Sequence, residues 1–303
     1  MTAAATSSST RTRPFAWSLR REIWEHGSIY IAPAAICGVV ILGFLSSTVG
    51  MPHRRLQTLQ LDNAHQAVVM GEPYAFAAAA IIGVAELVAW FYCLGALFNE
   101  RRDRSVLFWR SLPVSDLTAT LAKAAVPMAV IPLLTFVLVA LTEGVILLLS
   151  TLIVAASGVS TAIPWTVGSV GQEGVLLSYE IVTATLWMAP VYAWFMLVSS
   201  WAKRSPFLWA VLPPAALCLL ERLAFGTTKL LGLLSDRLFG AEHHALVHGA
   251  GIQFNVKGAI PPTGLAAIDL EKFVSAPGLW IGLVLAAATF AATVWMRRRR
   301  DPI

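Results

Sequence analysis

Long stretches without any charged residue alternate along the chain with short segments in which charges are dense. An α-helix needs about 20 apolar residues to cross the hydrocarbon core of a bilayer, and six stretches reach roughly that length. Their apolar positions follow one another without alternation, which favours helices over the strands of a membrane barrel. We therefore predict six spanning helices, at roughly 29–49, 74–98, 126–152, 179–200, 206–224 and 277–296.

Two of these spans depart from the simple pattern. The third apolar stretch is longer than one crossing requires, and Pro213 with Pro214 interrupts the helical pattern of the fifth. The expected fold is an all-α membrane protein with a single transmembrane domain over residues 14–300. The small and polar residues 1–13 are expected to be disordered.

The composition supports the membrane assignment and excludes other classes. Hydrophobic residues make up 57% of the chain and charged residues 13%, with a mean hydropathy of +0.70. A soluble domain carries about 25% charged residues, so this chain has too few polar residues to cover a soluble particle. All three cysteines fall within predicted spans, which argues against a disulfide framework.

The positions of the basic residues predict the topology. With six spans and a cytoplasmic N-terminus, most of the 22 lysines and arginines lie on the cytoplasmic side, as the positive-inside rule requires. Both termini are therefore expected in the cytoplasm. The basic isoelectric point then reflects topology, and no nucleic-acid partner is expected.

The segment 14–27, before the first span, has the pattern of an amphipathic helix. Phe15, Leu19 and Ile23 recur every four residues, while Arg20 and its charged neighbours fall largely elsewhere on the helical wheel. This favours an interfacial helix on the cytoplasmic leaflet, with its arginines facing anionic lipid. The alternative is that 14–27 simply extends the first span.

The segment 99–123 is the most informative part of the chain outside the spans. A run of charged residues, 100–104, is followed at once by an apolar and aromatic run, 106–109, and then by the helix-capping residues Ser115 and Asp116. Exposed aromatic residues beside charges are typical of a surface that docks a partner. The alternative is that the aromatic side chains lie among lipid headgroups.

The run ERRDRSVLFWRSLPVSDLTATLAK, together with REIWEHGSIYIAP at the first span, resembles the permease subunits of bacterial ABC type-2 exporters. The six spans, the N-terminal amphipathic helix and the long external segment before the last span are also similar. The resemblance implies a multi-pass subunit of the bacterial inner membrane that couples to ATP-binding subunits through the loop between its second and third spans. By matching motif, the coupling role falls on Glu100, Arg101, Arg102, Asp103, Arg104, Ser105, Phe108 and Trp109.

The same resemblance implies the partners of the chain. These are two copies of an ABC ATP-binding subunit, a second copy of the permease or a homologous one, and membrane lipids. The sequence contains no G-x-x-x-x-G-K-[ST] phosphate loop, and the near match 226–229 lacks its spacing. We therefore expect a non-catalytic subunit without a cofactor, with ATP and Mg²⁺ bound by the partner. The resemblance implies export, and the expected substrate is a lipid, a peptide or an antimicrobial-type compound.

A carboxyl group near the middle of the second span is the main candidate inside the membrane. Glu86 would be costly in lipid, so it is expected to face the bundle interior. It either lines a substrate path or gate, or it is a hydrogen-bonded structural carboxyl that joins two helices. Gly83 and Trp90 lie one turn away, and Glu143 in the third span is a further candidate.

The external segment 225–276 is too long for a turn and is expected to form short helices before the last span. Its histidines have no companions that indicate catalysis, and no metal site is expected. In the last span, Gly278 and Gly282 form an edge that suits close packing.

Two other functions are weighed against the exporter. A proton-coupled secondary carrier would use Glu86, but the chain shows no internal repeat and only this one mid-span carboxylate. An intramembrane enzyme is disfavoured because G-x-S-x-G, H-E-x-x-H and a pair of aspartates within spans are all absent.

Overall fold

The computed structural model describes residues 14–47, 63–103, 114–156, 170–247 and 264–299. Within these ranges the regular elements are helices, and the one β-type contact is an isolated bridge between Leu246 and Ile268. The disorder expected for residues 1–13 lies outside the described residues.

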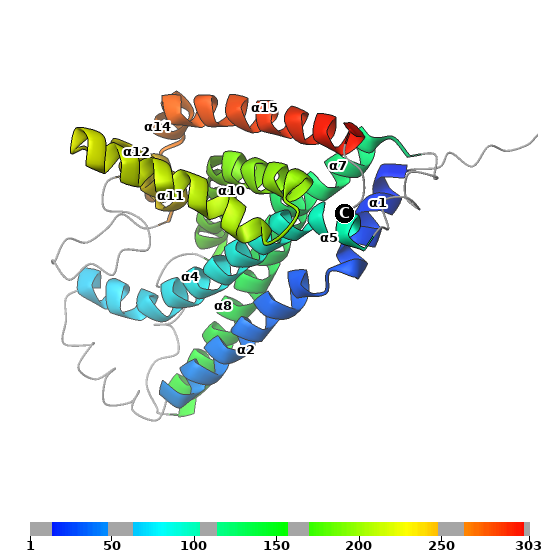
Figure 1. Cartoon of the computed structure of the whole chain (residues 1–303). Helices are drawn as coiled ribbons and strands as arrows, with labels where there is room; N and C mark the ends of the chain where they lie inside the picture. The colour runs from blue at the N-terminus through cyan, green and yellow to red at the C-terminus, as the bar shows by residue number, and fades with distance from the viewer. Residues whose placement is uncertain (1–13, 48–62, 104–113, 157–169, 248–263, 300–303) are drawn as a thin grey trace, which may run out of the picture.

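Six helices are long and apolar enough to cross a membrane, which confirms the predicted all-α membrane fold. The elements that form them are α2 (Ser28–Ser47), α4 (Asn63–Gly95) with the short α5 (Phe98–Arg102), α7 (Asp116–Ala125) continued by η2 (Val126–Val130) and α8 (Ile131–Ala156), α10 (Val170–Trp201), α11 (Pro206–Phe225) and α15 (Pro277–Arg299). Figure 1 shows α10 in the middle of the bundle, between α15 on one side and α4 and α8 on the other.

The third span begins well before the predicted residue 126. One apolar helical segment of 38 residues runs from Asp116 to Ile153. Ser115 determines its start, because the Oγ of Ser115 accepts a hydrogen bond from the backbone N–H of Thr118 at 3.1 Å. This is an N-cap, which satisfies one of the donors that a helix start leaves free.

The fifth span is one continuous helix in spite of Pro213 and Pro214. Proline lacks an N–H, so Pro214 cannot bond the carbonyl of Ala210 one turn earlier. The indole N–H of Trp194, on α10, donates to that carbonyl oxygen at 3.1 Å instead. A side chain of the neighbouring helix therefore satisfies the group that the proline leaves free.

The N-terminal helix α1 (Pro14–Glu25) is separate from α2, because the chain turns at His26 and Gly27. The reading of 14–27 as an extension of the first span is therefore wrong. Trp17 and Trp24 are exposed, and the guanidinium of Arg20 stacks over the Trp24 ring at 4.4 Å. The opposite face of α1 packs against α7.

The short helices expected before the last span are α12 (Lys229–Phe239), α13 (Ala241–Ala245), η3 (Gly264–Ala267) and α14 (Leu270–Ser275). Arg237 fixes α12 to the bundle, since its guanidinium donates to the carbonyl oxygens of Trp187 at 3.0 Å and Gly278 at 2.6 Å. A Cβ at Gly282 would lie 2.5 Å from Nη2 of Arg237. The small edge at Gly278 and Gly282 thus accommodates an arginine side chain of the same chain.

Candidate functional site

A cluster of charged side chains lies where α1, α5, α7 and the C-terminal end of α15 meet, at one end of the bundle (Figure 1). It contains three acidic and three basic residues, which are Arg21, Glu22, Glu100, Asp116, Lys123 and Arg297. These residues come from four separate helices, and three regions of the sequence contribute to the group. We call this group the junction cluster.

Glu22 and Lys123 form the centre of the junction cluster. The Nζ of Lys123 donates to Oε1 of Glu22 at 2.8 Å, and each side chain is only 1% exposed. Arg21 donates to the same carboxylate oxygen at 2.7 Å, and the hydroxyl of Tyr92 on α4 donates to the other at 2.9 Å. The carboxylate of Glu22 is therefore surrounded by donors.

These donors determine the protonation state of Glu22. Burial alone would raise the pKa of this carboxyl, but Lys123 and then Arg21 outweigh burial and hold the pKa below its ordinary value. Burial also acts to lower the pKa of Arg21, and Glu22, Glu100 and Glu25 together keep that pKa above its ordinary value. The carboxylate of Glu22 and the guanidinium of Arg21 are therefore charged at neutral pH.

Glu100 connects α5 to the same cluster. One of its carboxylate oxygens lies 2.9 Å from Arg21 and 3.1 Å from Lys123, and the other lies 3.3 Å from Arg297. The Nε of Arg297 also donates to Asp116 at 3.2 Å, at the start of α7. The last turn of α15 is thus held to the beginning of α7 and to α5.

Such a network determines geometry more than it adds net stability. Desolvation of buried ions offsets much of their attraction, whereas removing one partner leaves an uncompensated charge and costs about 3–5 kcal/mol. The charges of the six side chains balance, so the cluster tolerates burial only while all its members remain together. A displacement of α5 therefore has to move α1, α7 and α15 as well or break ion pairs.

A second set of contacts holds α5 to the end of α10. The guanidinium of Arg101 donates to the carbonyl oxygens of Ser199 at 3.1 Å and Ala202 at 2.5 Å, where the helix leaves carbonyls free. In return, the Oγ of Ser199 accepts from the backbone N–H groups of Leu97 and Phe98 at 3.0 and 2.9 Å. The corner between α4 and α5 is thereby fixed against the most central helix.

The structure divides the predicted coupling residues into two groups. Glu100 and Arg101 point inward and are 8% and 7% exposed, so they are not available for direct contact with a partner. Arg102 and Asp103 are exposed and form a surface ion pair at 3.4 Å. The remaining predicted residues, Arg104, Ser105, Phe108 and Trp109, lie outside the described residues.

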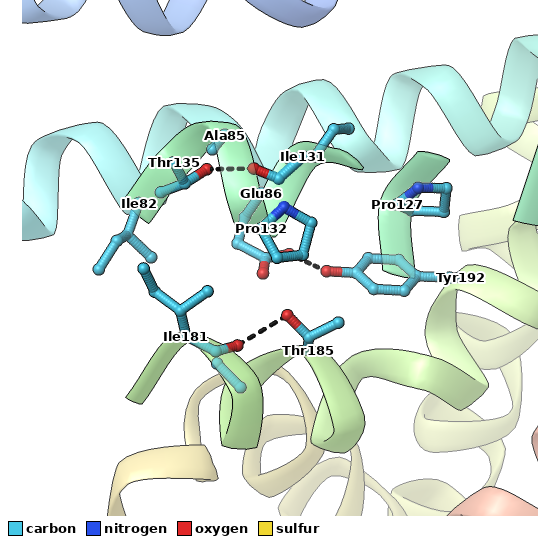
Figure 2. Close-up of a pocket in the computed structure, with 11 residues that line it drawn as sticks. Ile82, Ala85, Glu86, Pro127, Ile131, Pro132, Thr135, Ile181, Thr185 and Tyr192 are labelled. Carbon is cyan, nitrogen blue, oxygen red and sulfur yellow. Dashed lines mark hydrogen bonds between the residues drawn. The ribbon is translucent and has the colours of Figure 1, made fainter. Parts of the chain in front are cut away.

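The predicted interior carboxyl lies at a small cavity between α4, η2 with α8, and α10 (Figure 2). The hydroxyl of Tyr192 on α10 donates to Oε2 of Glu86 at 2.6 Å, so this hydrogen bond joins two spans. That contact is the one expected of a structural carboxyl. The position in a cavity wall is the one expected of a pathway residue, so the geometry fits both of the alternatives predicted for Glu86.

The other residues predicted beside Glu86 lie away from the cavity. No other part of the described chain approaches within 4 Å of a Cβ placed on Gly83, and the closely packed small residues of α4 are Ala85 and Ala89 instead. Trp90 packs edge-to-face on Phe195. Glu143, on α8, is partly buried and does not line the cavity.

The junction cluster was not predicted as a unit. Lys123 and Arg297 each stand near the end of a span, where basic residues are expected for topology alone. The one available signal was Glu22, because an acidic residue in a helix that packs on the bundle needs a basic partner. Which basic residue is the partner of Glu22 depends on the tertiary structure.

Comparison with protein-family models, with curated proteins and with solved structures finds no match to this chain. The assignment of a function therefore rests on the sequence motif and on the geometry of the two sites.

Proposed function

We propose that this chain is the transmembrane permease subunit of an ATP-driven exporter of the ABC type-2 kind. The observation that carries the proposal is the position of α5, at the beginning of the motif-bearing segment. Glu100 ties α5 to α1, α7 and α15, and Arg101 ties it to α10. A partner that pushes on this segment would therefore move spanning helices rather than a loose loop.

The two groups of motif residues have different roles in this proposal. The exposed side chains of Arg102 and Asp103 contact the ATP-binding subunit, together with the residues that follow them. The buried side chains of Glu100 and Arg101 pass the movement on to the bundle. Docking and transmission are thus performed by neighbouring residues of one short helix.

The wider assignment follows from the same proposal. The subunit resides in the bacterial inner membrane with both termini in the cytoplasm, pairs with a second permease and binds two ATP-binding subunits. ATP and Mg²⁺ are bound by those partners, and the exported substrate is a lipid, a peptide or an antimicrobial-type compound. The junction cluster then lies on the cytoplasmic side, next to the ATPase.

Copurification tests the proposal directly. The tagged chain is expressed with the products of its neighbouring genes, purified and reconstituted in liposomes. An ATPase is expected to copurify, and its activity is expected to depend on the permease. If no ATPase copurifies and ATP has no effect on transport in the liposomes, the proposal is wrong.

A charge-swapped variant tests the docking surface. Arg102→Glu with Asp103→Arg keeps the net charge and the surface ion pair but inverts the pattern that a partner meets. We expect at least a tenfold loss of ATPase binding with normal folding. Arg222→Glu is the matched control, since Arg222 is an exposed arginine at the C-terminal end of α11. Unchanged binding in the swapped variant would remove the docking assignment.

The alternative of a proton-coupled secondary carrier is supported by one observation, the cavity at Glu86. A carrier of this kind would transport in liposomes with a pH gradient and without any ATPase. Substitution of Glu86 by Gln would abolish such transport. The same reconstituted preparation therefore distinguishes the two functions.

A further inference from the structure

The cavity at Glu86 has an unusual chemical lining. Its volume is about 20 Å³, which is room for one water molecule or one ion of similar size. Glu86 of α4 faces Thr135 of α8 and Thr185 of α10 across this space, and Tyr192 closes one side (Figure 2). Three separate helices thus contribute oxygen atoms.

The hydroxyl oxygens that line the cavity have donated their protons elsewhere and can act only as acceptors toward a ligand. Tyr192 already donates its proton to Glu86. Thr135 donates to the carbonyl of Ile131 and Thr185 to that of Ile181, each within its own helix, at 2.8 and 2.7 Å. A hydroxyl that has donated its proton can still accept, and no Lys, Arg or His is among the described residues that line the cavity.

The backbone beside the cavity is irregular. Pro127 and Pro132 both line it, and each lacks the N–H that would bond a carbonyl of the preceding turn. Between them the chain forms the π-helical turn η2, a geometry that is frequent at functional sites. The cavity therefore presents one carboxylate and three hydroxyl oxygens among largely apolar side chains, and the described residues that line it offer no free side-chain donor.

The charge of the site indicates the charge of its ligand. An ionised carboxylate inside an apolar bundle is costly unless a positive charge compensates it. No basic side chain of the described residues forms an ion pair with Glu86, in contrast to Glu22 and Glu100 of the junction cluster. One carboxylate balances one positive charge, whereas a divalent ion would leave an uncompensated charge in the bundle.

We propose that the cavity at Glu86 binds a single monovalent metal cation of the size of Na⁺, coordinated by the carboxylate and by the hydroxyl oxygens of Thr135 and Thr185. Hard cations of this type prefer oxygen ligands. The ion would link α4, α8 and α10 through one site, next to the proline-rich turn where the third span changes its helical form. This site does not depend on the proposed exporter function.

Binding can be measured on the purified full chain in nanodiscs of neutral lipid. The thermal midpoint is followed as NaCl replaces choline chloride at constant ionic strength, and ²²Na⁺ binding is measured in parallel. Ligands that bind only the folded state raise the midpoint in a saturable manner. We expect such a rise for the wild type, its loss in Glu86→Gln, and at least tenfold weaker Na⁺ binding in Thr185→Val.

A matched control exists for the threonine variant. Thr142 is buried and donates to the carbonyl of Leu138 in the same way, but it does not line the cavity. Thr142→Val is therefore expected to bind Na⁺ like the wild type. If Glu86→Gln does not fold, the contrast between the two threonine variants decides the question.

Three results would overturn the proposal. The first is no saturable Na⁺ effect between about pH 5 and about pH 9, a range in which a carboxyl changes from partly to fully ionised. The second is a dependence on pH alone that Glu86→Gln removes, which would make Glu86 a protonated acid beside a water molecule. The third is equal Na⁺ binding in the Thr185→Val and Thr142→Val variants.

Discussion

Lys123 of the third span and Glu22 of the N-terminal helix form an ion pair at 2.8 Å in which each side chain is 1% exposed. The two residues are 101 positions apart in the sequence. A buried pair of this kind depends on both partners, because removing one leaves the other with less opposite charge away from water. The pair therefore couples the position of α1 to that of the third span.

Replacing Lys123 by Met is expected to destabilise the protein by about 3–5 kcal/mol, since Met fills a similar volume but removes one of the two bases that Glu22 and Glu100 share, the other being Arg21. The double variant Glu22→Gln with Lys123→Met should lose clearly less than the sum of the two single losses. Thermal unfolding in nanodiscs measures all four states of this double-mutant cycle. Lys203→Met, at an exposed lysine, is the control. Additive losses would show that the two side chains are not coupled.

Acid is expected to weaken the junction cluster through Glu22. The pKa of Glu22 in the folded protein is below its ordinary value, so the unfolded chain binds a proton at a higher pH than the folded one. The contribution of Glu22 to stability is therefore complete above the ordinary glutamate pKa of about 4.3 and is lost as the pH falls through the lower folded value. Thermal midpoints measured down to about pH 3 should show this loss. In Glu22→Gln the same decrease should be smaller, and an identical decrease would exclude Glu22 as its origin.

Removal of the Ser199 hydroxyl should loosen α5 without affecting the rest of the bundle. Ser199→Ala leaves the N–H groups of Leu97 and Phe98 without their acceptor, at a cost of about 1–3 kcal/mol. Faster amide hydrogen exchange at the beginning of α5 is the expected result. Ser200→Ala is the matched control, because Ser200 is equally buried but bonds only to the carbonyl of Leu197 in its own helix. Equal exchange in both variants would contradict the role of Ser199.

The parts of this structure that the sequence predicted are those that depend on one segment at a time. Charge exclusion locates the six spans of the described residues, and the sequence predicts the cap at Ser115. The helix that this cap starts belongs to the third span itself, whereas the sequence predicts that it only leads into the span. The junction cluster could not be predicted, because Lys123 and Arg297 cannot be distinguished in the sequence from basic residues that only determine the membrane topology. The edge at Gly278 and Gly282 was recognised as a close-packing surface, but its occupant, Arg237, is set by tertiary structure.

Trp194 is expected to matter only while residue 214 is a proline. Trp194→Phe removes the indole N–H that bonds the carbonyl of Ala210, which should cost about 1 kcal/mol. In a Pro214→Ala background the new backbone N–H at residue 214 can bond that carbonyl, so the same substitution should cost much less. Thermal unfolding of the four variants tests this coupling. A cost of Trp194→Phe that is equal in both backgrounds would show that packing alone explains it.

Gly282→Ala should displace Arg237, because the added Cβ would lie 2.5 Å from Nη2 of the guanidinium. The guanidinium is the flexible end of its side chain and can shift, so the cost is that of its lost hydrogen bonds, about 1.5–3 kcal/mol for a bond to a charged group, which outweighs the gain of up to about 1 kcal/mol that alanine brings to a helix. Loss of the bonds from Arg237 to the carbonyls of Trp187 and Gly278 should also increase hydrogen exchange in α12. Gly83→Ala is the matched control, since it adds the same methyl group to a spanning helix where no described neighbour lies within 4 Å, and it should be neutral or stabilising. If α12 exchanges at the same rate in both variants, Arg237 is not what fixes that helix to the bundle.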